Sequence, residues 1–497
     1  EVLDQLSVRD VVSWSTLIAG YSEQGRVHEV MNCFEQMQHE GLSPDAVTFI
    51  CILKACGSKM AIEKGRQVHM EIACRELLEK NTMLGNALVD MYAKCGVLVK
   101  ARQVFEDLEV RDIVTWNALI TGFAQEGECD EALHYFEGMQ KEGFSPNGVT
   151  FICILKACAN TGAIDKGEQI HEMIASEGLL QKDAVLANAL LDMYVKCGML
   201  AKAQKVFEDL RVRDAICWNA LIAGYTEQGE ADEAIKCYKQ MQSEGVSPNV
   251  VTFICILKAC GSIRAADKGK EVHKEIESSS LLEADISVGN ALVDMYSRCG
   301  LLAKAEEVLN GLVVRDVVSW NALLTGYVQE GHAEEALCCF DKMQREGLSP
   351  DVVTLICILK ACCSIGAIDK GKRIHNEIVN RGLLERDAVL GNALVDMYAK
   401  CGLHSKARRV LEELPIQDSG SWNALIASYA RQGQGHEALH CYEQMQRKGL
   451  CPDVITFICI LKAFGSTGAI DKAKQIHSEI VHRGLLENHI VLGNALI

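Results

Sequence analysis

A period of 102 residues runs through this chain. Its five tryptophans, Trp14, Trp116, Trp218, Trp320 and Trp422, each follow the last at this spacing, and five of the six prolines keep the same step. Self-similarity at a fixed period indicates repeats that pack mainly against their neighbours. The pattern overrides the roughly three or four globular domains that a chain of 497 residues would otherwise suggest.

Each block of 102 residues divides into three repeats that predict pairs of helices. In one block they are 113–147, 148–183 and 184–214, with lengths of 35, 36 and 31 residues. The apolar spacing of the first predicts helices from Ile113 to Glu126 and from about Glu128 to Glu142, each followed by glycine. Helix pairs of this size stack into a solenoid. The expected fold is all-α, a right-handed superhelical α-solenoid of helix-turn-helix repeats.

The composition fits a helical chain and excludes several classes of function. Only 6 prolines accompany 49% hydrophobic and 24% charged residues, which excludes disorder and favours helices. The net charge of −17 gives no general attraction to nucleic acids or acidic membranes, so any nucleic-acid binding has to be local. No uncharged apolar stretch approaches about 18 residues, so no membrane span is expected.

The 23 cysteines include no C-x-x-C pair and no Cys/His set with zinc-ligand spacing. Many lie in apolar runs such as 49–53, where a reduced cysteine behaves as a small hydrophobe. We therefore expect a reducing compartment and no disulfide framework. Residues 1–10 show no features of a signal or transit peptide, so we expect that targeting is absent or that the chain begins after it.

Several motifs recur with the period. They are the alternating repeat lengths, the Trp-Asn-Ala-Leu-Ile openings (116–120), Asp-Met-Tyr-Ala-Lys-Cys-Gly (90–96) and Ser-Pro-Asp turns. On these motifs the chain resembles, from end to end, plant pentatricopeptide-repeat (PPR) proteins of the PLS subclass. The resemblance implies one continuous solenoid, made of a partial S repeat at 1–10, P-L-S triplets at 11–112, 113–214, 215–316 and 317–418, P and L repeats at 419–489, and a partial S repeat at 490–497.

The repeats of each type follow from this division. The P repeats are 11–45, 113–147, 215–249, 317–351 and 419–453. The L repeats are 46–81, 148–183, 250–285, 352–387 and 454–489. The complete S repeats are 82–112, 184–214, 286–316 and 388–418. Both ends stop inside a repeat without a polar capping helix, so we expect a fragment or a trimmed array.

The fifth and last residues of the P and S repeats are short polar side chains. They could be structural, with Asn packed at a helix start and Asp or Asn capping the next helix. The resemblance implies a function instead, because at these two places the family reads single-stranded RNA, one base per repeat. The fifth residues are Ser15, Asn86, Asn117, Asn188, Asn219, Asn290, Asn321, Asn392 and Asn423. The last residues are Asp45, Asp112, Asn147, Asp214, Asn249, Asp316, Asp351, Asp418 and Asp453.

The resemblance also implies which base each pair reads. A last Asp accepts a hydrogen bond from the ring N–H of uracil or guanine, whereas a last Asn donates to the ring nitrogen of cytosine or adenine. Ser15 with Asp45 should read G, the six Asn–Asp pairs U, and the two Asn–Asn pairs C with U tolerated. With the amino end at the 5′ side, the predicted target is 5′-GnUYnUYnUUnUUn-3′. The L repeats are expected to be spacers, because their fifth residues are Ile50, Ile152, Ile254, Ile356 and Ile458.

Apolar residues at the second place could sandwich the bases, or could serve ordinary inter-helix packing. Ser287 and Gly420 depart from the pattern. The apolar set is Val12, Met83, Val114, Val185, Ile216, Val318 and Val389.

Basic residues recur on the first helices of the L and S repeats. They could contact phosphates, or could complement the negative end of a helix dipole. The L set is Lys54, Lys156, Lys258, Lys360 and Lys462, and the S set is Lys94, Lys196, Arg298 and Lys400.

His-x-Glu, as in His69-x-Glu71, resembles half of the zinc-deaminase signature, but the cysteine half is absent. We interpret these recurring histidines as amphipathic helix surface and the tryptophans as core. No phosphate-binding glycine loop or nucleophile elbow is present. We expect no catalytic site, no cofactor and no metal.

The sequence therefore predicts a selective single-stranded RNA-binding solenoid that is not an enzyme and does not bind membranes. The proteins it resembles specify sites of RNA editing in the mitochondrion or chloroplast, usually through an E/DYW extension with deaminase activity that is not recognised here. Accessory organelle RNA-editing factors are the implied partners. The rival is a peptide-binding scaffold of the related tetratricopeptide type, which gives no reason to restrict the paired places to Ser, Asn and Asp.

Overall fold

The computed structural model describes residues 9–78, 81–279, 281, 285–385, 387–415, 417–467, 470–485 and 492. These residues form 28 α-helices, one 3-10 helix, η2 (Leu383–Glu385), and no strand. The predicted all-α class is confirmed. Most of the partial S repeats predicted at 1–10 and 490–497 lies outside the described residues. The chain comprises two compact bodies, Glu1–Thr252 and Phe253–Ile497.

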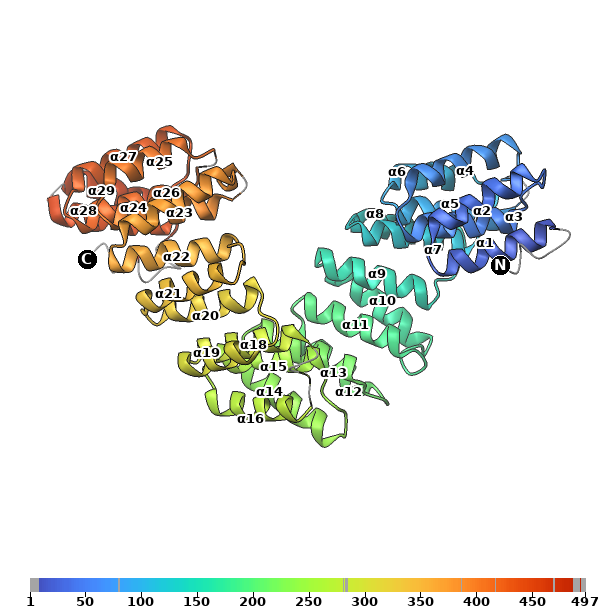
Figure 1. The fold of residues 1–497 in the computed structure, drawn as a ribbon, viewed down its shortest axis with the longest axis horizontal. Coiled ribbons are helices and arrows are strands. Elements are labelled where there is room, and N and C mark those ends of the chain that lie inside the picture. Colours follow the sequence, from blue (N-terminus) through green and yellow to red (C-terminus); the bar gives the residue numbers. More distant parts are fainter. Residues whose placement is uncertain are drawn as a thin grey trace. The chain divides into compact units, whose positions relative to one another are not determined.

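The amino-terminal body consists of helix pairs that follow one another along the chain (Figure 1). The first helices are α1 (Val11–Glu23), α3 (Ala46–Ser58), α5 (Thr82–Lys94), α7 (Ile113–Gln125), α9 (Gly148–Thr161), α11 (Ala184–Lys196) and α13 (Ala215–Glu227). The second helices are α2 (Val27–His39), α4 (Ile62–Cys74), α6 (Leu98–Asp107), α8 (Cys129–Lys141), α10 (Ile164–Ser176), α12 (Leu200–Asp209) and α14 (Ala231–Ser243). Each first helix packs against its own second helix and against the next first helix, as α5 does against α6 and α7.

The carboxy-terminal body is built the same way. Its first helices are α15 (Val250–Ser262), which begins at the end of the other body, α18 (Ile286–Arg298), α20 (Val317–Gln329), α22 (Val352–Ile365), α24 (Ala388–Lys400), α26 (Ser419–Arg431) and α28 (Val454–Thr467). The second helices are α16 (Ala266–Ser278), α19 (Leu302–Gly311), α21 (Ala333–Arg345), α23 (Ile368–Asn380), α25 (His404–Glu413), α27 (Gly435–Arg447) and α29 (Ile470–His482).

The helices end where the sequence placed glycine. Helix α7 begins at Ile113, as predicted, and ends one residue before the predicted Glu126, and α8 falls within its predicted bounds. Gly127 then adopts a φ of 82°, a left-handed conformation that glycine takes without steric cost. Every first helix starts at the residue where a repeat was predicted to start. The assignment of the repeats to P, L and S types stays a prediction.

The tryptophans lie in the core, as predicted, with side chains at most 3% exposed. Trp116 packs edge-on against Phe105 of the preceding repeat, with ring centroids 4.6 Å apart. The first helices α5 and α7 approach each other closely at Gly122, where an added Cβ would lie only 2.5 Å from the Cβ of Ala93. The hydrophobic contact between neighbouring repeats therefore continues from one first helix to the next.

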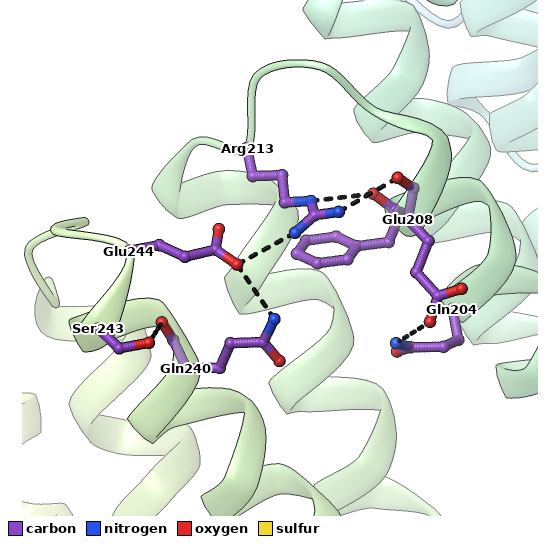
Figure 2. Close-up of polar contacts among 7 residues, drawn as sticks. Gln204, Glu208, Arg213, Gln240, Ser243 and Glu244 are labelled. Atoms are coloured by element: carbon purple, nitrogen blue, oxygen red, sulfur yellow. Dashed lines mark hydrogen bonds and ion pairs between the residues drawn. The ribbon is translucent and has the colours of Figure 1, made fainter.

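Arg213 joins the repeat 184–214 to the following repeat, 215–249 (Figure 2). Helix α12 spans 10 residues, three fewer than the 13 of α14. Arg213 caps the carboxy-terminal end of α12 by donating to the carbonyls of Phe207 (3.2 Å) and Glu208 (3.1 Å). The guanidinium also lies 4.8 Å from the centre of the Phe207 ring and bonds Glu244 at 3.0 Å. One side chain thus connects two repeats.

We expect Arg213→Ala to lower the free energy of unfolding by about 1–3 kcal/mol, because it removes two bonds to carbonyls and a cation–π contact. The Glu244 ion pair adds little, since solvent screens it. The control is Arg211→Ala, which truncates an exposed arginine two residues away. Urea unfolding followed by circular dichroism measures both, and equal midpoints for the two variants would contradict this role.

Four histidines that the sequence placed on the helix surface pack against tyrosines. Nδ1 of His171 lies 2.9 Å from the hydroxyl of Tyr194, and the same pairing recurs at His69/Tyr92, His273/Tyr296 and His375/Tyr398. The surface explanation is wrong for His273, which is buried, whereas the other three rings are half-buried and keep part of their surface exposed. Burial lowers the pKa of all four rings, since the imidazolium loses solvation.

These histidines predict that stability falls as the pH drops below about 6.5. Above that pH the rings are neutral in both states, whereas below it the unfolded chain takes up protons first, because the folded pKa is lower. The unfolding free energy of His375→Phe, measured against the parent, should therefore shift in favour of the variant between about pH 7.5 and 5.5. The exposed His477 supplies the control, His477→Phe. A difference for His375→Phe that does not vary with pH would count against this explanation.

Candidate nucleic-acid interface

The last residue of each P and S repeat caps the first helix of the next repeat. Oδ1 of Asp112 accepts from the backbone N–H groups of Val114 and Thr115, both at 2.9 Å, and Oδ1 of Asn147 accepts from that of Thr150 at 3.1 Å. All nine last residues form such a cap. The capping explanation is therefore confirmed, and it uses only one atom of each head group.

The fifth residue of the same repeat contacts this capping side chain. Nδ2 of Asn86 donates to both carboxylate oxygens of Asp112, at 3.1 and 3.0 Å, and Nδ2 of Asn117 donates to Oδ1 of Asn147 at 3.3 Å. Ser15 is the exception, because its hydroxyl bonds that of Thr48 at 2.7 Å. The corresponding bond occurs in the pairs 219/249, 290/316, 321/351, 392/418 and 423/453.

Capping leaves one head-group atom of the last residue able to meet a ligand. In Asp112, Oδ2 accepts only from Asn86, so it keeps capacity for another donor. In Asn147, Oδ1 is taken by the cap, and Nδ2 bonds no residue in the described part of the chain. At the same place an Asp therefore offers an acceptor and an Asn offers a donor. Capping and base reading can be done by different atoms of one side chain.

The last residues are more accessible than the fifth. Asp45, Asn147, Asn249 and Asp351 are exposed and the other five are half-exposed. Among the fifth residues, Asn423 is only 6% exposed, and Ser15, Asn86, Asn219 and Asn321 only 8% each. Burial of the fifth residue against the next helix makes it first of all a support for the last one.

Hydrogen bonds also fix the charge of three of the last carboxylates, Asp112, Asp214 and Asp453. Burial by itself would raise the pKa of Asp112, but bonds from the Thr115 backbone N–H and the Asn86 amide outweigh it and lower the pKa. The pKa values of Asp214 and Asp453 are lowered in the same way. These three side chains are ionised acceptors at neutral pH.

The apolar second residues face solvent. Their exposure runs from 55% for Val114 to 70% for Val12, so the alternative of inter-helix packing is wrong for them. A Cβ at Gly420, the second place of one repeat, would lie 2.8 Å from Nδ2 of Asn392 in the preceding repeat. The second place therefore adjoins the polar pair of the repeat before it. Together they form a first-helix face that alternates exposed apolar and polar groups.

The basic residues divide into two groups. Those of the S repeats form ion pairs with an aspartate four residues earlier, at 2.6–2.8 Å, as Lys196 does with Asp192. Those of the L repeats are exposed, and no residue in the described ranges forms a salt bridge with them. Of these two groups, the L group is the one whose basic side chains form no salt bridge within the described ranges.

Comparison with known proteins identifies the family. Models of the PPR repeat family match residues 9–58, 111–160, 213–262, 315–364 and 417–466, and a PPR repeat model matches 86–113, 185–214, 290–317 and 392–415. The chain belongs to the pentatricopeptide repeat family. Across its described residues, no cluster of three or more His, Cys, Asp or Glu could hold a metal ion. No described helix is long and apolar enough to cross a membrane.

Curated relatives from Arabidopsis thaliana match most of this pentatricopeptide-repeat chain. The protein At5g27110 is 34% identical over 96% of the chain and 69% of its own length. At4g18520, named chloroplastic, is 34% identical over 94% and 75%, and At2g03380, named mitochondrial, is 32% identical over 96% and 69%. Among solved structures, maize PPR10 superposes with a TM-score of 0.68 at 20% identity, covering 98% of this chain and 76% of PPR10. PPR10 in complex with an 18-nt psaJ RNA element gives 0.55 at 18% identity, covering 99% and 86%.

A third residue, which the sequence analysis missed, completes the polar network of these pentatricopeptide repeats. It is the third residue of the next first helix, three places after the cap. Thr115 donates to Oδ1 of Asn86 at 2.5 Å and Thr150 to Oδ1 of Asn117 at 2.6 Å. Thr252 and Thr354 do the same. The sequence signal is Thr or Ser three residues after the capping Asp or Asn.

Serine at this third place behaves differently. Ser319 donates to the backbone carbonyl of Asp316 at 2.8 Å, and Ser421 to that of Asp418 at 3.0 Å. Among the described residues, Oδ1 of Asn290 and of Asn392 is buried without a partner, and so is Oδ1 of Asn423, whose third-place neighbour Thr456 donates to Asp453 instead. A threonine has fewer χ1 states than a serine because of its second Cβ substituent.

We expect Ser319→Thr and Ser421→Thr each to stabilise the chain by about 1 kcal/mol, because the threonine hydroxyl can donate to the buried amide oxygen, as those of Thr115 and Thr150 do. The control is Ser13→Thr, since Ser13 bonds only its own cap, Asp10. Thermal unfolding of the three variants measures the effect. If Ser319→Thr gains no more than Ser13→Thr, the unpaired oxygens do not limit stability.

Proposed function

We propose that this chain is a PLS-type pentatricopeptide-repeat protein that binds single-stranded RNA, one nucleotide per repeat, with the base selected by each P and S repeat. The division into triplets from residue 11 to 418, followed by P and L repeats to 489, is part of this proposal. The observation that carries it is the repeated first-helix face. In it an accessible donor or acceptor, held by a cap and a fifth-place amide, lies beside an exposed apolar side chain.

The chemistry of the last residue supports the assignment of bases. Oδ2 of Asp112 can accept the ring N–H of uracil, whereas Nδ2 of Asn147 can donate to the ring nitrogen of cytosine. The fifth residue holds the last one in place and adds its own amide or hydroxyl at the edge of the site. The proposed target remains 5′-GnUYnUYnUUnUUn-3′, read with the amino end at the 5′ side.

The names of the relatives support the proposed biological setting. Two of them carry the names chloroplastic and mitochondrial, and a solved structure with the same fold contains RNA. We place the chain in one of these organelles, where it would specify a site for RNA editing or processing together with accessory organelle RNA-editing factors. Its residues would supply recognition without chemistry.

A peptide-binding scaffold is the second candidate. An extended peptide presents backbone N–H and C=O groups in every residue, so a peptide site has no use for an Asp/Asn choice at one position of each repeat. The acidic net charge of −17 suits a basic peptide, which keeps this candidate as an outcome of the test below.

The test is an oligonucleotide selection on the chain and on Asn147→Asp. The substitution replaces a donor by an acceptor at one place, so the fourth position of the selected RNA should change from C toward U while the other positions stay. Asn310→Asp is the control, because it makes the same change at an exposed site on α19. An unchanged fourth position, or selection of no RNA, would reject the assignment, and the second result would favour the peptide scaffold.

A further inference from the structure

The L repeats have the same exposed apolar second place as the P and S repeats. Their second residues are 50–59% exposed, and they are Val47, Val149, Val251, Val353 and Ile455. The isoleucine at their fifth place is half-buried in all five repeats. Exposed aliphatic side chains that recur in this way cost free energy in water unless a ligand covers them. A spacer that touched nothing would have no need of them.

The lysine of each L repeat lies on the same helix face, four residues after the fifth place. Lys156 is exposed and has no salt-bridge partner in the described ranges. The corresponding ninth place is Thr121 in the preceding P repeat, and in the following S repeat it is Asp192, which pairs with Lys196. At the ninth place of this triplet's first helices, the lysine of the L repeat is therefore the one cation, and it forms no salt bridge with a described residue.

The polar support that selects a base is missing from the L repeats. Asp183, the last residue of an L repeat, caps α11 through Oδ1, but the fifth residue Ile152 has no amide to hold its second oxygen. The edge of a base beside Ile152 would contact an aliphatic side chain, which has no hydrogen-bond donor or acceptor. This contact therefore favours none of the four bases.

We propose that each L repeat binds one nucleotide of any base, with the faces of the base covered by the apolar second residues and the phosphate paired with the lysine. This proposal rests on the proposed function. It replaces the expectation that the L repeats are spacers, because each of them would contribute to the affinity for RNA. The P and S repeats then provide discrimination, and the L repeats provide binding energy that does not depend on sequence. In a chain with a net charge of −17, these lysines reduce the repulsion between protein and RNA.

The test uses the predicted target with an abasic site at its fifth nucleotide, which faces repeat 148–183. Loss of that base should weaken binding roughly three- to tenfold, at the lower end of what a base stacked on an aromatic side chain contributes because the covering residues are aliphatic, whereas exchanging it among A, C, G and U should change little. Val149→Ala should weaken binding to the intact RNA and reduce the penalty of the abasic site. Equal affinity for abasic and intact RNA would overturn the proposal.

A second measurement isolates the lysine. Lys156→Gln should weaken binding to every RNA by the same factor and reduce the slope of log Kd against log salt by about 0.7. The matched control is Lys196→Gln, whose lysine is already paired with Asp192 and should change the slope less. Both lysines are exposed on helices, and thermal unfolding verifies that the variants fold. An unchanged slope for Lys156→Gln would overturn the phosphate contact.

The two proposals can fail separately. Base selection at the P and S positions combined with indifference to the abasic site would reject the part given to the L repeats and keep the proposed function. Loss of affinity at the abasic site without selection at any P or S position would reject the base assignments and keep an RNA-binding L repeat.

Discussion

Every first helix of the described chain depends on one hydrogen bond, in which a backbone N–H of its first turn donates to an Asp or Asn of the preceding repeat. A helix leaves these first N–H groups without intrahelical partners, and a short side-chain oxygen satisfies one of them. The need for a cap fixes the type of the capping residue, its extended backbone and its place at the junction between repeats. The cap therefore also fixes the position of the other terminal side-chain atom, Oδ2 in Asp or Nδ2 in Asn.

One side chain both caps a helix and offers a hydrogen-bonding atom to a ligand. Oδ1 forms the cap in both Asp112 and Asn147, but the other terminal atom is an acceptor, Oδ2, in Asp112 and a donor, Nδ2, in Asn147. A change between Asp and Asn leaves the cap in place and reverses the hydrogen-bonding character that is offered to a ligand. In the proposed function, a repeat can therefore change the base that it selects and keep the hydrogen bond that caps its helix. The fifth residue, buried at 6–8% exposure in five of the nine repeats, restricts the orientation of this group.

Much of this could be predicted from sequence, since a period of 102 residues repeats each local signal several times. Helix α7 began at the predicted Ile113, and Trp116 lay in the core as expected. Access to side chains could not be predicted, because it depends on neighbouring repeats. The burial of Asn86 arises from the next helix and its Thr115, and the exposure of Val149 from packing that leaves the second place uncovered. The Lys196–Asp192 ion pair could have been predicted, because an aspartate four residues before a lysine on a helix commonly pairs with it. The sequence analysis considered the lysine without this aspartate.

The most direct measurement of the central claim is a crystal structure of this chain with the RNA 5′-GAUCAUCAUUAUUA-3′. The account predicts that the ring nitrogen of the fourth base lies within hydrogen-bond distance of Nδ2 of Asn147 and that of the third base near Oδ2 of Asp112, each base covered by second-place side chains. An RNA bound along the second helices, or bases that leave the fifth and last residues bonded only to each other, would contradict it.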